Sequence, residues 1–406
     1  MTSHAAFPFA HVPPHAGDPI LSLMEAFQAD PRPHKASLGI GIYMDDGGRL
    51  PCLESVRQAE TRLAQDIQPR PYLPMEGLAA YRGAVQRLLF GADSEALQAG
   101  RIATVQTVGG TGALKLGADF LHRHFPAAGI WVSDPTWDNH HAIFGGAGVP
   151  VRTYPYYDAS TGAVRFDAML AALESLPPQS IVLLHASCHN PTGVDLSPAQ
   201  WEQLIPVLQR RELLPFVDIA YQGFGAGLQD DAFAVRALAA AGLTFLVANS
   251  FSKNFSLYGE RVGGLSVVCA DRATADTVLG QLKSEVRGNY GTPPVHGARV
   301  VTQVLEDPEL FALWTAETDA MRRRIRAMRE QLHAVLHDTF GSRRSFAYLL
   351  TQRGMFSYTG LDPAQVDRLR EDHGVYLIRS GRLCLTGLTT RNVAHVARCI
   401  AAVVER

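Results

Sequence analysis

The sequence predicts an α/β fold, with a mostly parallel sheet covered by helices and a second, smaller domain towards the C-terminus. Three observations support this prediction. Short apolar runs alternate with helix-like segments in the middle of the chain, and a long amphipathic helix follows after about residue 300. In addition, 47% of the 406 residues are hydrophobic, which is enough to bury a large core.

Five apolar runs have the length of a buried strand and are bounded by polar or glycine residues. They lie at residues 130–132, 181–184, 215–217, 244–248 and 265–269. Helix-like segments occur at 111–124, 197–211 and 231–241. The amphipathic segment 318–338 contains five arginines, and a last helix is predicted to run through Arg406. We expect the Pro-rich first 35 residues to cross a surface or a partner subunit, because they fit poorly inside an α/β core.

Composition and charge exclude several classes of protein. The formal net charge is −2, so no overall basic field attracts nucleic acid or an anionic membrane. Five scattered cysteines form no C-x-x-C pair, which predicts reduced thiols in a cytoplasm and no metal site. No basic start precedes a continuous apolar stretch, and no apolar run approaches the roughly 20 residues of a membrane helix. We therefore expect a cytoplasmic protein without an anchor.

Reactive side chains follow three of the apolar runs. His185 and the segment HNPTG at 189–193 follow the first of these runs, Asp218 and Tyr221 follow the second, and NSFSK at 249–253 follows the third. Ligands of open α/β sheets bind beyond the carboxyl ends of the strands. The sequence thus predicts that these residues face one crevice.

Lys253 stands out because the chain has only four lysines against 33 arginines. A lysine amine can lose its proton and form an imine with an aldehyde, which arginine cannot do. Asp218, at the end of a buried run, would need a cation or hydrogen-bond donors nearby, and a pyridinium nitrogen would be such a cation. An exposed loop lysine and a helix N-cap aspartate remain the alternatives for these two residues.

The segment GGTG at 109–112 opens a helix-like stretch, where free backbone N–H groups suit a phosphate. It matches neither G-x-G-x-x-G nor a P-loop, so a dinucleotide site has little support, and a simple tight turn remains open. Ser250, Ser252 and Arg261 add two hydroxyls and a guanidinium. Together these groups suit a phosphorylated aldehyde cofactor.

The segment SFSKNFSLYGERVG at 250–263 resembles the cofactor-lysine motif of class I, fold type I pyridoxal-phosphate aminotransferases, in the aspartate and aromatic subfamily. Further matches follow in the expected order over nearly the whole chain. They include GIGIY at 39–43, YLPMEGL at 72–78, WVSDPTWDNH at 131–140, CHNPTG at 188–193, DIAYQGFG at 218–225, RGMFSYTG at 353–360 and SGR at 380–382. The resemblance implies a large domain with a seven-stranded sheet at 49–315, a small domain at 316–406 and an N-terminal arm at 1–48 that joins the small domain.

The resemblance also implies a role for each cofactor contact. Lys253 would hold pyridoxal 5′-phosphate as a covalent imine and shuttle a proton, while Asp218 would keep the pyridine nitrogen protonated. The other cofactor contacts would be Trp137 on the ring, His140 behind the aspartate, Asn190 and Tyr221 at the phenolic oxygen, and Gly110, Thr111, Ser250, Ser252, Arg261 and the other subunit's Tyr72 at the phosphate. Lys253, Asp218 and Tyr221 would be the catalytic residues.

Substrate would be bound by Gly41, Trp137, Asn190, Arg382 and Arg287. Arg382 would pair with the α-carboxylate, and Arg287 from the neighbouring subunit with a distal carboxylate, so the resemblance implies a homodimer with shared sites. The alternative for each of these residues is an ordinary core or surface side chain without a role in binding. Arg379 departs from the family pattern, in which a small residue is usual, and is expected to add a cation near the α-carboxylate site. Ala186 and Ser187 also depart from it.

The implied activity is a two-stage amino transfer in which the cofactor alternates between its pyridoxal and pyridoxamine forms. Several motifs resemble the bacterial aromatic branch, so tyrosine, phenylalanine and tryptophan are the expected donors, together with aspartate and glutamate, and 2-oxoglutarate is the expected acceptor. An aspartate aminotransferase with little aromatic activity is the alternative. A pyridoxal-phosphate lyase or a cofactor-binding regulator is more remote, because a regulator would need an added DNA-binding domain.

Overall fold

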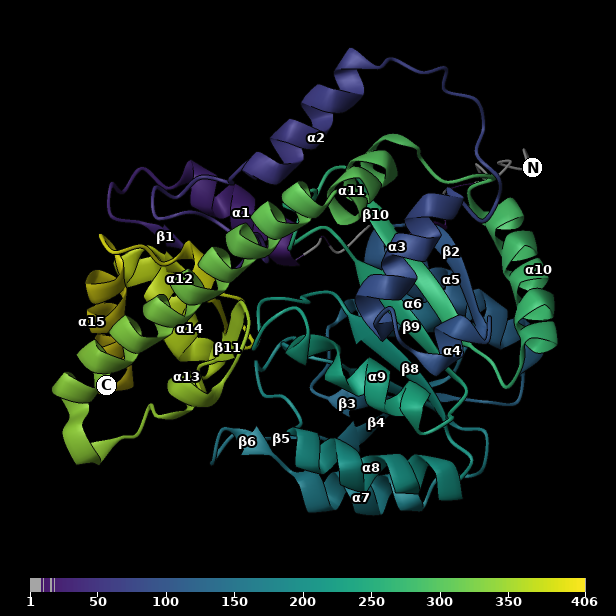
Figure 1. Cartoon of the computed structure of the whole chain (residues 1–406). Helices are drawn as coiled ribbons and strands as arrows, with labels where there is room; N and C mark the ends of the chain where they lie inside the picture. The colour runs from purple at the N-terminus through teal and green to yellow at the C-terminus, as the bar shows by residue number, and fades with distance from the viewer. Residues whose placement is uncertain (1–8, 10, 15–16, 18, 406) are drawn as a thin grey trace, which may run out of the picture.

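A seven-stranded sheet forms the centre of the molecule (Figure 1). The computed structural model describes residues 9, 11–14, 17 and 19–405. Most of the Pro-rich start of the predicted N-terminal arm, and Arg406 of the predicted last helix, lie outside this description. In spatial order the strands are β2 (Ile102–Val108), β10 (Val262–Val268), β9 (Phe245–Ser250), β8 (Leu214–Ile219), β7 (Ile181–His185), β3 (Ile130–Asp134) and β4 (Val151–Pro155).

All neighbouring strands of this sheet pair in parallel except β10, which is antiparallel to both β2 and β9. The predicted α/β class with a mostly parallel sheet is therefore confirmed. All five apolar runs form strands of the sheet. Their continuous apolar character follows from burial on both faces, as β7 shows. Its alternate residues Ile181 and Leu183 belong to one core cluster, whereas Val182 and Leu184 belong to another.

Helices cover both faces of the sheet (Figure 1). The cluster that contains Ile181 also includes side chains of three helices: α5 (Gly109–His124), α6 (Asn139–Gly146) and α10 (Arg272–Asn289). The opposite cluster includes side chains of α2 (Glu54–Gln65), α3 (Ala79–Phe90), α4 (Glu95–Gln98), α7 (Phe166–Glu174), α8 (Pro198–Arg210), α9 (Phe233–Ala240) and α11 (His296–Glu306). No helix in the described part of the chain has both the length and the apolar character that crossing a membrane requires.

The longest helix, α12 (Pro308–Phe340), joins two cores. Asp307 caps it by accepting hydrogen bonds from the backbone N–H groups of Glu309 and Leu310, which explains why it begins before the amphipathic segment that predicted it. Its first half, including Trp314, packs in the cluster that contains Val182. Leu332, in its second half, packs in a third cluster.

The third core cluster gathers both ends of the described chain. Ala36 and Leu38 lie in it beside side chains of the C-terminal elements, and the strand β1 (Ala36–Ser37) pairs in parallel with β12 (Val375–Tyr376). The remaining elements are α1 (Pro19–Ala29), α13 (Tyr348–Thr351), α14 (Pro363–His373), α15 (Val393–Val404), the pair β11 (Phe356–Tyr358) and β13 (Arg382–Cys384), and the pair β5 (Tyr157–Asp158) and β6 (Ala163–Val164).

Candidate active site

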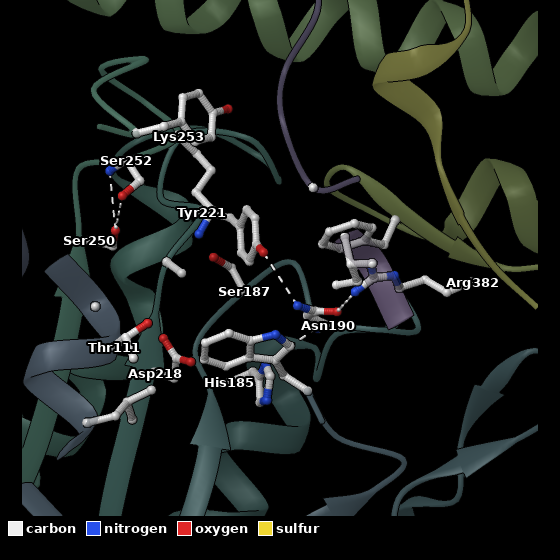
Figure 2. Close-up of a pocket in the computed structure, with 18 of the residues that line it drawn as sticks. Thr111, His185, Ser187, Asn190, Asp218, Tyr221, Ser250, Ser252, Lys253 and Arg382 are labelled. Carbon is white, nitrogen blue, oxygen red and sulfur yellow. Dashed lines mark hydrogen bonds between the residues drawn. The ribbon is translucent and has the colours of Figure 1, made fainter. Parts of the chain in front are cut away.

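A pocket of about 230 Å³ lies beyond the carboxyl ends of β7, β8 and β9 (Figure 2). It is lined by Ile20, Gly41, Gly110, Thr111, Leu114, Trp137, His185, Ser187, Asn190, Asp218, Ala220, Tyr221, Ser250, Ser252, Lys253, Tyr258, Arg261, Phe356 and Arg382. The pairing of the strands explains this convergence. His185 of β7 lies beside Asp218 of β8, and Ile219 lies beside Asn249 of β9, so the segments that follow all leave the same edge of the sheet.

The amine of Lys253 reaches into this pocket from the turn that follows β9. Its Nζ lies 4.8 Å from the centroid of the Tyr221 ring, and Figure 2 shows the side chain extended towards that ring. Burial, opposed by the charge of Asp218 and assisted by the positive charge of Arg261, lowers the pKa of Lys253 to about 8. The alternative of an exposed loop lysine therefore does not describe this residue.

Asp218 lies buried at the end of β8 with His140 behind it. His140 Nε2 donates a hydrogen bond to Asp218 Oδ2 over 3.2 Å, and His140 Nδ1 lies 2.8 Å from Thr136 Oγ1. Burial would raise the pKa of Asp218, but the hydrogen bond from His140 and the positive charge of Lys253 help to hold it below its ordinary value. No helix in the described chain begins at Asp218, so the N-cap alternative is wrong for it.

Asn190 connects Tyr221 with Arg382. Its Nδ2 donates to the Tyr221 hydroxyl over 3.5 Å, and its Oδ1 accepts from Arg382 Nη1 over 3.3 Å (Figure 2). Arg382 Nη2 donates to the Gly39 carbonyl, its guanidinium lies 4.5 Å from the centroid of the Phe356 ring, and its buried Nε has no partner in the described structure. Burial raises the pKa of the Tyr221 phenol. The site thus places a fixed cation opposite the lysine.

A cradle of small and cationic groups lies at the N-terminus of α5. Gly109 has a φ of +69°, and a Cβ there would lie 2.7 Å from Arg261 Nη2, so only glycine allows the guanidinium to approach the start of the helix. Arg261 Nη1 donates to Ser252 Oγ over 3.5 Å, and Ser252 Oγ lies 3.1 Å from Ser250 Oγ. Hydroxyls, a guanidinium and helix N–H groups are the donors that a phosphate requires.

These groups fit pyridoxal 5′-phosphate. Lys253 supplies an amine for the aldehyde, the ionised Asp218 suits a protonated ring nitrogen, and the cradle suits the phosphate. Inside the pocket, the buried Nε2 of His185 and the Oγ of Ser187 have no hydrogen-bond partner among the described residues, as expected where a polar ligand belongs. Trp137 lines the pocket and meets the His140 ring edge-on, with 5.2 Å between the ring centroids.

Two arginines and one tyrosine that the sequence singled out lie outside this pocket. The Tyr72 side chain is 94% exposed, and Arg287 is exposed on α10, so neither reaches the pocket of its own chain. The expectation that Arg379 adds a cation beside the α-carboxylate site is wrong. Its exposed guanidinium binds Asp367 over 2.9 Å and does not line the pocket, so the neighbouring carboxylate compensates its charge.

Seven lining residues were given no role in the predicted site: Ile20, Leu114, His185, Ser187, Ala220, Tyr258 and Phe356. His185 follows an apolar run and lies in the expected crevice, although the sequence assigned it no role. Burial lowers its pKa to about 3, which keeps the ring neutral. Tyr258 lies within the lysine motif, and its hydroxyl accepts a hydrogen bond from the backbone of Tyr43. Phe356 lies within the motif at 353–360, but only its contact with Arg382 reveals its place in the site.

Comparison with known proteins identifies the family of the chain. The family model "Aminotransferase class I and II" matches residues 33–400. The chain is 60% identical to the aromatic-amino-acid aminotransferase of Escherichia coli (strain K12), over 97% of this chain and 100% of the relative. It is 52% identical to an aspartate aminotransferase of Pseudomonas aeruginosa, over 95% of this chain and 97% of the relative.

A solved structure agrees with these sequence matches. The aromatic-amino-acid aminotransferase of Burkholderia pseudomallei, covalently bound to pyridoxal phosphate, superposes with a TM-score of 0.96 at 53% identity and covers 98% of this chain and 100% of that one. The fold, the pocket and the sequence matches agree. The chain belongs to the class I and II aminotransferase family.

Proposed function

We propose that this chain is a pyridoxal-phosphate-dependent aminotransferase that moves amino groups from aromatic amino acids, and from aspartate and glutamate, to a 2-oxo acid such as 2-oxoglutarate. The observation that carries this proposal is the convergence of Lys253, Asp218 and Arg382 in one pocket of a class I and II aminotransferase. Relatives named for aromatic amino acids and for aspartate, at 60% and 52% identity, support the dual range of donors.

The residues of the pocket divide the chemistry among them. When bound, pyridoxal phosphate supplies an aldehyde that exchanges amino groups and a ring that accepts the electron pair left at Cα. Lys253 Nζ would hold that aldehyde, and as a free, uncharged amine it would take up the Cα proton of the substrate and carry it to C4′. Asp218, held ionised by His140, keeps a proton on the ring nitrogen.

Arg382 holds the α-carboxylate of the substrate and so orients Cα towards Lys253. Its guanidinium is fixed from both sides, by the Gly39 carbonyl and by Asn190, so binding costs little ordering of the side chain. Asn190 and Tyr221 would donate hydrogen bonds to the phenolic oxygen of the cofactor, and Gly110, Thr111, Ser250, Ser252 and Arg261 would hold its phosphate. Gly41 and Trp137 enclose the substrate.

A homodimer completes the site. We propose that Tyr72 and Arg287 reach the pocket of the neighbouring subunit, where Tyr72 contacts the phosphate and Arg287 the distal carboxylate of dicarboxylic substrates. The exposure of both side chains in a single chain supports this assignment. The residue divisions 1–48, 49–315 and 316–406 are part of the same proposal, and the third core cluster supports a small domain built from both ends of the chain. Five free cysteines support a cytoplasmic location.

The position of Arg287 has to be compatible with substrates that carry an anionic side chain and with substrates that carry an apolar one. We propose that the Arg287 side chain swings out for aromatic substrates, because burying it unpaired against a ring would be costly. Arg287→Leu is expected to reduce kcat/KM for aspartate about 10- to 100-fold, the loss of one charge-assisted hydrogen-bond pair, and to leave phenylalanine nearly unchanged. Equal losses with both substrates, measured by steady-state kinetics, would contradict this role.

The first test is the half-reaction of the holoenzyme. Phenylalanine and, separately, aspartate are added without any oxo acid, and the absorbance of the bound cofactor is followed. Conversion to the pyridoxamine form by both amino acids supports the proposal, and their relative rates rank the donors. Conversion by aspartate alone would make the chain an aspartate aminotransferase. No absorbance of a bound cofactor after pyridoxal phosphate is supplied would overturn the assignment.

Lys253→Ala tests the proton transfer. The variant should retain the cofactor non-covalently, because Asp218 and the phosphate cradle remain, yet its half-reaction rate should fall by about 10³-fold or more. The retained cofactor, measured by its absorbance after gel filtration, separates this loss from failure to bind. A half-reaction rate within tenfold of the wild type would refute the role of Lys253.

A further inference from the structure

A second, larger crevice lies apart from the active-site pocket. It has a volume of about 770 Å³ and lies between the turn after β8, the middle of α12 and the segment at α13. Helix α12 runs from beside the large sheet to the other side of the molecule, where α13 lies close to it (Figure 1). The crevice shares no lining residue with the active-site pocket. Its charged lining consists of four arginines, Arg322, Arg326, Arg329 and Arg353, and one glutamate, Glu330.

Carboxylates compensate only two of these arginines. Arg322 pairs with Asp319, and Arg326 pairs with Glu330 over 2.9 Å in an exposed contact that contributes little energy. Arg353 is exposed, and its guanidinium makes no ion pair or hydrogen bond with any described residue. The crevice therefore has a formal excess of positive charge.

Arg329 supplies a second charge that has no ion-pair partner among the described residues, deeper in the crevice wall. The residue is only 3% exposed, and its Nη atoms donate to backbone carbonyls, among them Gly354 at 2.9 Å and Arg353 at 3.3 Å. Its Nε is buried without a hydrogen-bond partner, and no carboxylate of the described chain lies within ion-pair distance. Burial accordingly lowers the pKa of Arg329 to about 9. The buried carboxyl of Asp195 acts on Arg329 only from beyond ion-pair distance, so an anion in the crevice would stabilise this buried cation further.

We propose that this crevice binds a compact polyanion that carries carboxylate or phosphate groups, held directly by Arg353 and Arg326 and favoured by the charge of Arg329. Planar guanidinium groups match both kinds of oxyanion with paired hydrogen bonds. At least two negative charges are required, because two of the arginines have no carboxylate partner. This inference does not depend on the reaction proposed for the active site.

The crevice and the active site share one wall. Arg329 Nη2 donates to the Phe356 carbonyl over 2.5 Å, while the Phe356 ring lines the active-site pocket beneath the guanidinium of Arg382. An anion bound beside Arg329 is therefore one residue away from the group that holds the substrate carboxylate.

Isothermal titration of the holoenzyme with pyrophosphate, and separately with citrate, tests the proposal at low ionic strength. Bound cofactor occupies the phosphate cradle of the active site, which removes that competing site. We expect saturable binding of at least one of the two anions with one site per chain, and the anion that binds distinguishes a phosphate from a carboxylate ligand. Arg353→Gln should weaken this binding about tenfold or more, the loss of one charge-assisted contact.

Arg379→Gln is the matched control, since Arg379 is an exposed arginine outside the crevice, and it should leave the affinity unchanged. Because Arg353 is exposed and outside the active site, Arg353→Gln should retain the half-reaction with amino acids, which verifies its fold. No saturable binding, an equal loss with Arg379→Gln, or binding that resists Arg353→Gln but disappears in Arg382→Lys would overturn the proposal. The last result would place the anion in the active site.

Discussion

The amine of Lys253 has a lowered pKa because burial disfavours its charged form. Its pKa of about 8 means that the uncharged amine, the form that attacks an aldehyde, predominates above pH 8. In the apoenzyme, the rate of covalent cofactor capture should therefore rise with pH up to about 8 and level off above it. Stopped-flow absorbance between pH 6.5 and 9.5 measures this profile. A rate that still rises steeply at pH 9.5 would indicate an unperturbed lysine.

Arg382 and Arg379, three positions apart, provide a matched pair of substitutions. Arg382→Lys should raise KM for both phenylalanine and aspartate about 10- to 100-fold, because a lysine cannot form the two-pronged pair with a carboxylate. Arg379→Gln should change KM less than twofold, since it removes only an exposed ion pair with Asp367. A large effect of Arg379→Gln in steady-state kinetics would mean that this guanidinium does reach the substrate.

At the level of elements, the contact between α5 and β8 positions the phosphate cradle. Gly117 of α5 lies against the Phe216 ring, and a Cβ at this position would be 2.5 Å from Phe216 Cζ. Gly117→Ala should therefore destabilise the protein by about 1–3 kcal/mol despite the better helix propensity of alanine. Thermal unfolding of the holoenzyme measures the shift.

Gly280 of α10 is the control for that substitution. A Cβ there meets no atom within 4 Å, so Gly280→Ala should be neutral or raise the unfolding temperature, because it reduces the entropy of the unfolded chain. If both variants were equally stable, the close packing of α5 on β8 would tolerate a side chain at position 117, which contradicts the prediction.

Two strands of the sheet, β4 and β2, contain no continuous apolar run, and the physical reasons differ. In β4, at the sheet edge, Arg152 and Thr153 are exposed, so no continuous apolar run exists. In β2, buried Thr104 and Gln106 interrupt the pattern, and Thr104 satisfies its hydroxyl by a hydrogen bond to Ser266 of β10. A polar residue in a buried strand depends on a partner from another strand, which local sequence does not reveal.

At the scale of the whole molecule, the proposed sharing of sites between subunits can be tested by mixing inactive variants. Lys253→Ala and Arg287→Leu homodimers each lack full aspartate activity. If Arg287 serves the neighbouring site, a hybrid dimer contains one site with both defects and one site with neither. Denaturing and refolding the two variants together should restore aspartate turnover, measured against each variant refolded alone. No restoration, despite hybrid dimers verified by mass spectrometry, would place both residues in the same site.

Much of the candidate site followed from sequence because its residues lie directly after apolar runs. Asp218, Asn190 and Lys253 all follow buried strands, and parallel pairing brings such positions to one edge of the sheet. Gly41 and Arg382 lie far from these strands in the chain, and only the resemblance to a family indicated them. Their place in the pocket depends on how the C-terminal elements pack on the large sheet, which no local pattern encodes.

The sequence by itself determined the class of fold and the strands buried on both faces, and it indicated the lysine, the aspartate and the groups proposed to bind a phosphate, because periodicity and residue chemistry are local properties. Only the tertiary structure decided the charge state of Lys253, the turning of Arg379 towards Asp367, and the crevice around Arg329 and Arg353. These features depend on burial and on neighbours that are distant in the chain, and such surroundings exist only after the chain has folded.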